Sequence, residues 1–176
     1  NLVNEFSDFA RMPKPVLKNN DLISILDESI NLSSEFDQSI NIVFLKKDKK
    51  ILFNCDKEQI SRVFFNLIKN SIESIMQKVD KIGNFDKKIS IEILDNNDHI
   101  SFVLVDNGIG FNDIKSDLKK ITNPYFTTKK NGTGLGLSIV NKIINDHNGE
   151  LLFFPIKDGA KVEIRFKING NRNINS

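Results

Sequence analysis

Apolar and polar positions repeat with two different periods along the chain, and the changes of period predict a mixed α/β domain. Apolar residues at helical spacing predict helices at 21–30, 57–79 and 134–147. Alternating apolar and polar residues predict strands at 40–45, 51–54, 89–94, 99–106, 150–154 and 161–167. We expect a turn at 46–50 to join the first two of these strands.

The segment 57–79 is the longest periodic stretch of the sequence. Its apolar residues fall on one broad arc of a helix: Ile60, Val63, Phe64, Leu67, Ile68, Ile72, Ile75, Met76 and Val79. A helix with so wide an apolar face packs against the core along most of its length. We therefore expect this helix to be largely buried.

The first twenty residues differ from the rest of the chain. Leu2, Val3 and Phe6 begin a short apolar pattern with helical spacing, and Pro13 and Pro15 then stop the helix. This stub is either the end of an upstream helix that packs on a partner or a disordered terminus. Because no start methionine or signal peptide precedes it, we expect a piece of a longer protein. The polar tail 169–176 is expected to fray.

Composition narrows the possible functions. The chain has 176 residues, of which 39% are hydrophobic and 14 are Phe, enough for one domain with an appendage. Its net charge of +2 gives no argument for binding nucleic acid or an anionic membrane. The single cysteine, Cys55, excludes a disulfide framework and is expected to be a small buried hydrophobic residue. No apolar run approaches the roughly 18 residues of a membrane span.

Glycine is scarce, but five of the nine glycines lie in two short segments. The first segment is Asp106-Asn107-Gly108-Ile109-Gly110, in which a carboxylate ends an apolar strand and two glycines allow the backbone to approach a ligand. An acceptor placed there suits an exocyclic amine such as that of adenine. From these five residues alone, an ordinary Asp-Asn-Gly turn is an equally good explanation.

The second segment, 131–138, alternates glycines and opens into the helix at 134–147. Free amides and the helix dipole at such a start favour an anion, most often phosphate. The segment lacks the Gly-Lys-Ser/Thr ending of a Walker loop, and it lies too late in the chain for a dinucleotide fold. A flexible loop remains the alternative.

Two further sets of polar residues are candidates for the same site. Asn66 and Asn70 lie one turn apart at the edge of the apolar arc, where their amide oxygens suit Mg²⁺. Taken alone, they are better explained as solvated asparagines. The polar stretch 107–132 is long for a connection and predicts a lid or a disordered loop. Lys129 on this stretch could reach a phosphate, or it could be a surface charge, as we expect for Lys130.

Four motifs occur together in the order found in the catalytic ATP-binding domain of bacterial sensor histidine kinases. Residues 65–71 (FNLIKNS) resemble the asparagine box, and 106–110 (DNGIG) the first glycine box of this family. Residues 124–129 (PYFTTK) resemble the phenylalanine box, and 132–137 (GTGLGL) the second glycine box. The resemblance spans roughly 21–168 and extends to gyrase, heat-shock ATPase chaperones and MutL repair proteins.

The resemblance implies a two-layer α/β sandwich of the Bergerat type, in which three helices back a mixed sheet. It implies that ATP and Mg²⁺ bind between helices 57–79 and 134–147, under a lid at 111–131. Asn70 would coordinate Mg²⁺, and Asp106 would receive the adenine amino group. The remaining contacts, to adenine or phosphate, would come from Gly108, Gly110, Lys129, Gly132, Thr133, Gly134, Leu135, Gly136 and Leu137.

Asn66 occupies a position where the ATP-hydrolysing relatives carry a glutamate base. An amide cannot take a proton from water, so we expect slow hydrolysis and favour phosphoryl transfer, with Asn66 and Lys129 as the catalytic residues. The alternatives are a nucleotide-gated ATPase or binding module without kinase activity, and an α/β domain with coincidental glycine turns. Ser71 replaces the usual alanine after the metal asparagine.

The segment 2–13 resembles the end of the second dimerisation helix of NtrY-like sensor kinases of nitrogen regulation. The resemblance therefore implies three parts: residues 1–20 as the end of the dimerisation region plus a linker, 21–168 as the catalytic domain, and 169–176 as the tail. It implies an acceptor histidine on a preceding helix, a response regulator, a homodimer in the full-length protein, and a cytoplasmic position in a membrane-anchored bacterial sensor.

Overall fold

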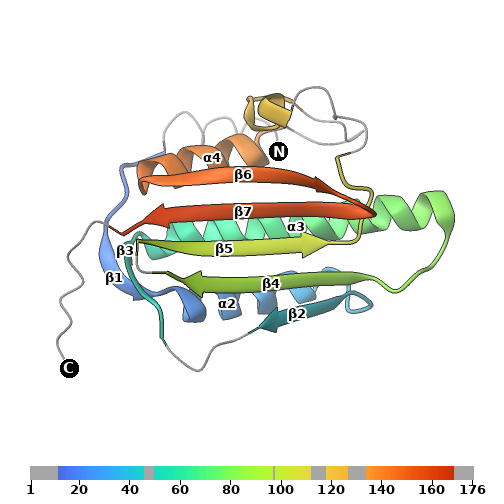
Figure 1. The fold of residues 1–176 in the computed structure, drawn as a ribbon, viewed down its shortest axis with the longest axis horizontal. Coiled ribbons are helices and arrows are strands. Elements are labelled where there is room, and N and C mark those ends of the chain that lie inside the picture. The colour runs from blue at the N-terminus through green and yellow to red at the C-terminus, as the bar shows by residue number, and fades with distance from the viewer. Residues whose placement is uncertain (1–11, 46–49, 97, 112–117, 127–133, 169–176) are drawn as a thin grey trace.

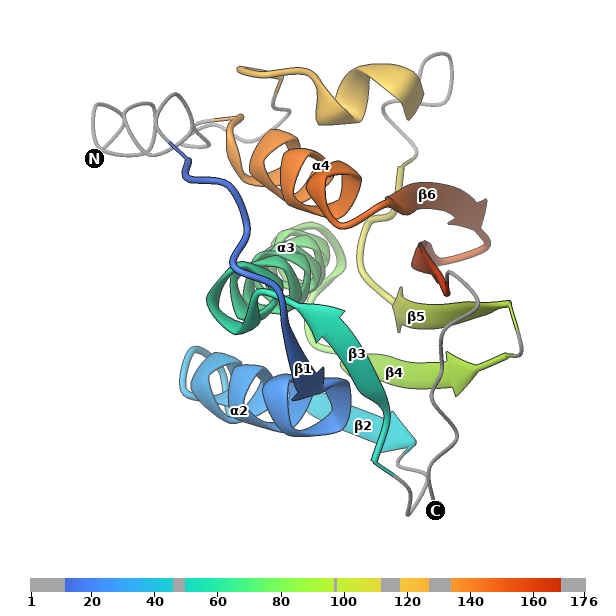
Figure 2. The same ribbon diagram turned by 90° about the vertical axis from the view of Figure 1, so that its left-hand side faces the viewer.

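The computed structural model describes residues 12–45, 50–96, 98–111, 118–126 and 134–168. The stub and the tail expected at the two ends lie outside these residues, apart from Met12 and the linker that follows it. Three helices form one layer, and a five-stranded sheet forms the other (Figures 1 and 2). The helices are α2 (Leu22–Ser34), α3 (Lys57–Ile82) and α4 (Gly136–Asp146). None of the described helices is both long enough and apolar enough to cross a bilayer.

The main sheet has the strand order β2-β4-β5-β7-β6. Its strands are β2 (Asn41–Leu45), β4 (Lys88–Asp95), β5 (His99–Asp106), β7 (Gly159–Lys167) and β6 (Gly149–Ile156). β2 runs parallel to β4, and every other neighbouring pair is antiparallel, so the sheet is mixed. The fold class expected from the sequence is confirmed.

Alternate residues of the central strands face the helices and form the core. Ile89, Ile91 and Ile93 of β4 are buried, as is the set Ile100, Phe102, Leu104 of β5. Phe102 stacks on Phe64 of α3 with ring centroids 4.8 Å apart. Because successive strand residues point to opposite faces, this pattern places the helices on one face of the sheet only.

The long helix α3 begins and ends at defined caps. At the start, the Asp56 carboxylate accepts a hydrogen bond from the Gln59 amide. At the end, Gly83 is the C-cap residue and has a φ of 81°. The apolar arc is buried from Ile60 to Ile75, as predicted. The expectation fails at Met76, which is 36% exposed, and α3 continues to Ile82, past the expected end at residue 79.

Two strands differ from the sequence-based expectation. The predicted strands at 40–45 and 51–54 do not pair with each other: β2 joins the main sheet, and β3 (Leu52–Cys55) pairs with β1 (Lys18–Asp21) in a separate two-stranded sheet. The sequence of β1 is Lys-Asn-Asn-Asp, which has no apolar alternation to reveal a strand. Asn20 secures this pairing because its amide donates to the Cys55 carbonyl at 2.8 Å.

α2 extends to Ser34, past the end predicted at residue 30. The hydroxyls of Ser29 and Ser33 donate to carbonyls one turn earlier, those of Ile25 and Ser29, which allows two polar side chains to be buried. Cys55 is fully buried, as expected, and burial raises the pKa of its thiol to about 11.

Candidate functional site

Asp106 ends β5 and is held in a fixed position although it is ionisable and only 4% exposed. Its Oδ2 accepts from the Ser71 hydroxyl of α3 at 2.8 Å, and its Oδ1 accepts from the Gly108 amide at 2.9 Å. Burial raises the pKa of Asp106; hydrogen bonds from Gly108, Ser71 and Ala160 and the charge of Lys78 oppose this rise without cancelling it. The carboxylate is therefore a buried, oriented acceptor.

The two glycines after Asp106 allow the chain to pass very close to its neighbours. A Cβ at Gly108 would lie 2.7 Å from the Ser74 carbonyl carbon of α3. Gly110 has φ of 67°, and a Cβ there would overlap the carbonyl of Gly159 at the start of β7. The predicted turn is thus clamped between α3 and β7.

The second glycine segment is described from Gly134 onward. Gly134 has φ of 69°, and its carbonyl accepts from the Tyr125 amide at 3.0 Å. α4 starts at Gly136, two residues later than expected, because the backbone of Gly134 is left-handed. The N-cap residue is the fully buried Leu135, and no side chain of the described residues caps this helix. Its first turn therefore presents backbone amides and the positive end of the helix dipole.

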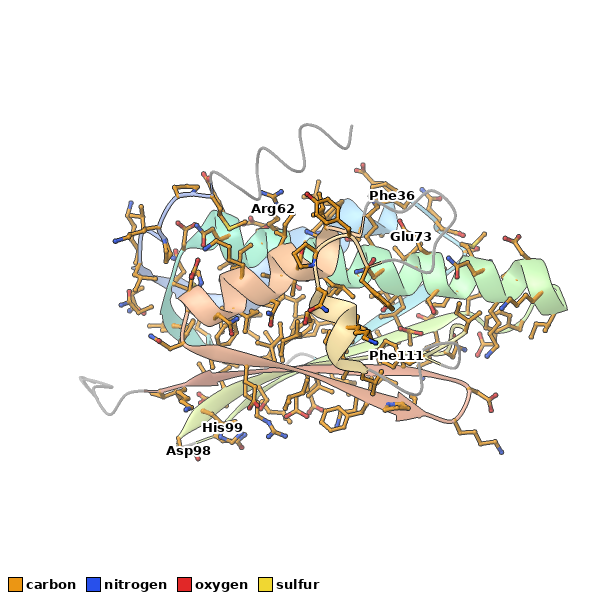
Figure 3. The ribbon with its side chains drawn as sticks, turned by 90° about the horizontal axis from the view of Figure 1, so that it is seen from above. Phe36, Arg62, Glu73, Asp98, His99 and Phe111 are labelled. Carbon is orange, nitrogen blue, oxygen red and sulfur yellow. The ribbon has the colours of Figure 1, made fainter. Side chains whose placement is uncertain are left out.

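Asn66 on α3 faces the start of α4. A Cβ at Gly136 would lie 3.4 Å from Asn66 Oδ1, while Asn66 Nδ2 donates to the Arg62 carbonyl at 2.8 Å. Asn70 lies one turn further on and is half-buried. Arg62 and Glu73, labelled in Figure 3, are on the turns of α3 just before and just after these two asparagines.

α3 consequently connects the two glycine segments. Through Ser71 it contacts Asp106, and through Asn66 it adjoins Gly136. Within the described residues, no group of three or more His, Cys, Asp or Glu could hold a metal ion. A divalent cation at this place would therefore depend on amide oxygens and on ligand oxygens.

The described parts of the predicted lid pack over α4. The short 3-10 helix η2 (Leu118–Thr122) buries Ile121, and Phe111 meets Phe153 of β6 edge to face at 5.8 Å. Phe111 is labelled in Figure 3, near η2. Among the predicted site residues, Lys129, Gly132 and Thr133 lie outside the described part of the chain. Leu137 is on the first turn of α4 and packs against the core.

Sequence reasoning did not identify three contributors to this site. Ser71 was noted only as a departure from a family pattern, yet its hydroxyl orients Asp106. Ser74 accepts from the Ile109 amide through its hydroxyl oxygen at 3.1 Å. Gly159 lies between the predicted strands at 150–154 and 161–167, and a Cβ there would overlap the Asp106 carbonyl. All three depend on contacts between segments far apart in sequence, for which the chain carries no local signal.

This combination of a mixed sheet, a clamped Asp-x-Gly-x-Gly turn and an uncapped helix start defines a family. The chain belongs to the histidine kinase-, DNA gyrase B- and HSP90-like ATPases, whose family model matches residues 55–170. The asparagine, first glycine, phenylalanine and second glycine motifs all lie within the matched range.

The chain is also similar to curated sensor kinases. It is 33% identical over 169 residues to an NtrY-like sensor histidine kinase of Rickettsia bellii, covering 96% of this chain and 26% of that protein. It is 30% identical over 171 residues to the nitrogen regulation protein NtrY of Azorhizobium caulinodans, covering 22% of that protein. The chain thus spans about a quarter of the length of the curated relatives it matches.

Among solved structures, the catalytic domain of histidine kinase ThkA is 26% identical, with a TM-score of 0.71. The match covers 86% of this chain and 95% of that one. Full-length ShkA, at 19% identity and a TM-score of 0.75, covers 94% of this chain and 35% of its own length. That second likeness establishes the fold alone.

Proposed function

We propose that this chain is the catalytic domain of a sensor histidine kinase, which transfers the γ-phosphate of ATP to a histidine on another segment of its protein. One observation carries the proposal: α3 joins a buried, oriented carboxylate to an uncapped helix start. A ligand that needs an acceptor at one end and amides for negative charge at the other is an adenine nucleotide.

Adenine would bind at Asp106. The carboxylate would accept a proton of the exocyclic amine, with Gly108 and Gly110 leaving room for the ring. A buried charged acceptor strengthens such a bond because little water competes for it. Guanine offers a carbonyl at the equivalent position, which a carboxylate would repel, so the site favours adenine.

The phosphates would lie at the start of α4. Lys129 and the backbone from Gly132 to Leu137 would contact them, and Asn70 would supply one oxygen to Mg²⁺. The chemistry of the donors fits this metal: Mg²⁺ is commonly held by one or two protein oxygens together with phosphates and water. When bound, the metal would offset charge on the transferred group.

Asn66 would position the phosphate end without acting as a base. Its Nδ2 is engaged by the Arg62 carbonyl, so its Oδ1 is the atom available toward α4. An amide oxygen accepts a hydrogen bond but does not remove a proton from water. The site therefore favours transfer to a presented nucleophile over hydrolysis.

The two histidines of the chain are poor acceptors of phosphate. His147 is 4% exposed, and both of its ring nitrogens are in hydrogen bonds. His99 begins β5, at the end opposite to Asp106 (Figure 3), about 23 Å away at the rise of an extended strand. We therefore place the acceptor on the dimerisation helices that the resemblance puts before residue 20.

The wider assignments follow from the relatives named above. The phosphoryl group would pass to an aspartate of a response regulator, the full-length protein would be a homodimer, and this domain would lie on the cytoplasmic side of a membrane-anchored sensor. The main alternative is a nucleotide-gated module of the same family that binds or hydrolyses ATP without transferring phosphate.

A reconstitution experiment separates these two functions. The chain is mixed with the histidine-bearing helical segment of its own protein, labelled ATP and Mg²⁺, and the products are tested for acid-labile, base-stable phosphate. We expect labelling of the helical segment, and much slower labelling with Asp106→Asn. Nucleotide binding or hydrolysis without any labelled histidine would favour the alternative, and no binding would overturn both.

A further inference from the structure

The linker at residues 12–17 is fastened to the start of α3 mainly by hydrogen bonds. The Val16 amide donates to Asp56 Oδ2 at 2.9 Å, and Gln59 Nε2 donates to the Pro13 carbonyl at 3.0 Å. Val16 and Leu17 are 64% and 47% exposed, while Met12, at the beginning of the segment, is partly buried against the hydrophobic core. A segment held in this way can detach at low cost in free energy.

Asp56 also connects the linker to the end of α4. Its backbone amide donates to His147 Nε2 at 3.1 Å, so the proton of the imidazole is on Nδ1, which donates to the Ile143 carbonyl at 2.8 Å. His147 is the C-cap residue of α4, and Asp56 is the N-cap residue of α3. In Figure 2 the blue segment that leads to β1 passes these two helix ends.

The proposed nucleotide site lies further along α3 and at the other end of α4, away from the contact between Asp56 and His147. Asn66 lies ten residues beyond Asp56, about 15 Å along α3, and the start of α4 is about 16 Å from His147. The two helices are packed together, and Gly136 adjoins Asn66 where they meet. A change at one end of this pair therefore alters the relative placement of the groups at the other end.

We propose that His147 is a positioning residue that couples the docking of residues 12–17 to nucleotide binding. With the linker docked, Asp56 and His147 hold α3 and α4 in the arrangement that suits the ligand; with it detached, that restraint is weakened. The proposal rests on the proposed function and adds a way for the preceding helices to influence ATP affinity. Such coupling is reciprocal, so nucleotide must also strengthen linker docking.

Hydrogen exchange at the Val16 amide of the whole chain tests whether nucleotide binding strengthens the docking of residues 12–17. We expect ADP with Mg²⁺ to slow exchange of this amide by about fivefold or more, in line with typical coupling between sites. Two matched variants assign the effect to His147. In His147→Gln the side-chain amide can reach the position of Nε2 and should retain the slowing, whereas His147→Asn keeps only the local bond to Ile143 and should lose it.

The effect of linker docking on nucleotide affinity is tested by weakening the attachment of the linker without altering His147. Gln59→Met removes the bond to Pro13 at nearly constant volume, and Gln59 Oε1 has no hydrogen-bond partner within the described residues, so little else is lost. We expect ADP affinity, measured by calorimetry, to fall about fivefold. Glu58→Gln, on the same turn but exposed, should leave the affinity unchanged.

The outcomes distinguish this inference from the proposed function. If the wild-type chain binds ADP but Val16 exchange is the same with and without it, the coupling is overturned and the kinase assignment stands. Equal slowing in His147→Asn and His147→Gln would remove His147 from the coupling. Failure of the wild-type chain to bind ADP would overturn the proposed function and, with it, the nucleotide coupling.

Discussion

The two ends of the candidate site are built in different ways. At the Asp106 end the carboxylate is buried and bonded to Ser71 and Gly108, and the backbone is in contact with α3 and β7. At the Gly136 end Asn66 and Gly136 are half-buried, and the nearest described side-chain atom to a Cβ at Gly136 would be 3.4 Å away. A tightly packed end can select one base, whereas a looser end can accommodate phosphates that move during transfer.

The largest difference is expected in nucleotide affinity when the charge of Asp106 is removed. Asp106→Asn loses a charged acceptor, which should weaken ATP binding on the order of 10- to 100-fold. The melting temperature should stay the same or rise, because the substitution removes a buried charge that is costly to desolvate. Calorimetry and thermal melts measure the two effects.

The control is Asp158→Asn, in an exposed turn residue with φ of 61°, which asparagine tolerates. It should leave both quantities unchanged. A stable Asp106→Asn protein with full affinity for ATP would refute the assignment of the adenine pocket.

Adding one methyl group at each end compares their packing directly. Gly108→Ala would press on the α3 backbone at Ser74 and Ile75 and should lower the free energy of unfolding by about 2 kcal/mol. In Gly136→Ala the added methyl group meets only Asn66 Oδ1 among the described residues. Because alanine is favoured in a helix, the free energy of unfolding should change by less than about 0.5 kcal/mol. Urea titrations provide both values; equal losses would mean that the two ends are packed alike.

Ser71→Ala tests the electrostatics of the tight end. Loss of the Ser71 hydroxyl should lower the free energy of unfolding by about 1 kcal/mol, because the helix preference of alanine partly offsets the lost hydrogen bond to the carboxylate. The pKa of Asp106 is already above its ordinary value of 3.8, and losing this donor should raise it further. The protonated oxygen of the Asp106 carboxyl group cannot accept a hydrogen bond from adenine, so nucleotide affinity should fall as the pH decreases. In Ser71→Ala this fall should begin at a higher pH.

Apo-protein stability should respond to pH in the opposite direction. A carboxyl group with a raised folded-state pKa binds its proton before the unfolded chain does, so acidification through that range adds stability through Asp106. Calorimetric binding curves measured from neutral pH down to the ordinary carboxyl pKa of 3.8, beside urea titrations, test both signs. Identical pH profiles for Ser71→Ala and the wild type would show that Ser71 does not tune this carboxylate.

The smaller effect on nucleotide affinity is expected at the Gly136 end. Asn66→Ala removes one neutral hydrogen-bonding group beside Gly136, and a loss of about 1 kcal/mol corresponds to roughly a fivefold weaker affinity for ATP. Ser61→Ala, earlier on the same helix and directed at Ser29, is the matched control. A loss of affinity as large as that of Asp106→Asn would mean that the phosphate end is as demanding as the adenine end.

The same contrast explains how much the sequence could predict. The long helix and the core strands follow from local periodicity, and the structure confirms them apart from their ends. The two glycine segments follow from composition, and their role in binding stays a prediction. The site roles of Asn66, Asn70, Asp106 and Lys129 stay predictions, which the experiments above address. The strand β1 was missed because its four polar residues are placed by pairing with β3 and by Asn20, not by an apolar face.

Contacts across the fold were also beyond the reach of the sequence. Ser71 lies on the same helix as the asparagines, but only the packing of α3 on β5 brings its hydroxyl to Asp106. β2 pairs in parallel with β4, which follows α3 in the chain. The alternation of apolar residues alone could not distinguish this pairing from a hairpin of β2 with β3.

The approach of Gly159 to the carbonyl of Asp106 limits how the chain can vary in length. The β6–β7 hairpin turn at 157–158 is exposed, a place where insertions are usually tolerated. Here an extra residue that shifted β7 by one position would bring a side chain to the place of Gly159, against the backbone of Asp106, and would turn the inward face of β7 outward. Length changes should therefore be better tolerated at the opposite end of the strands, in the turn between β4 and β5, where Asn96 and His99 close the hairpin away from the site.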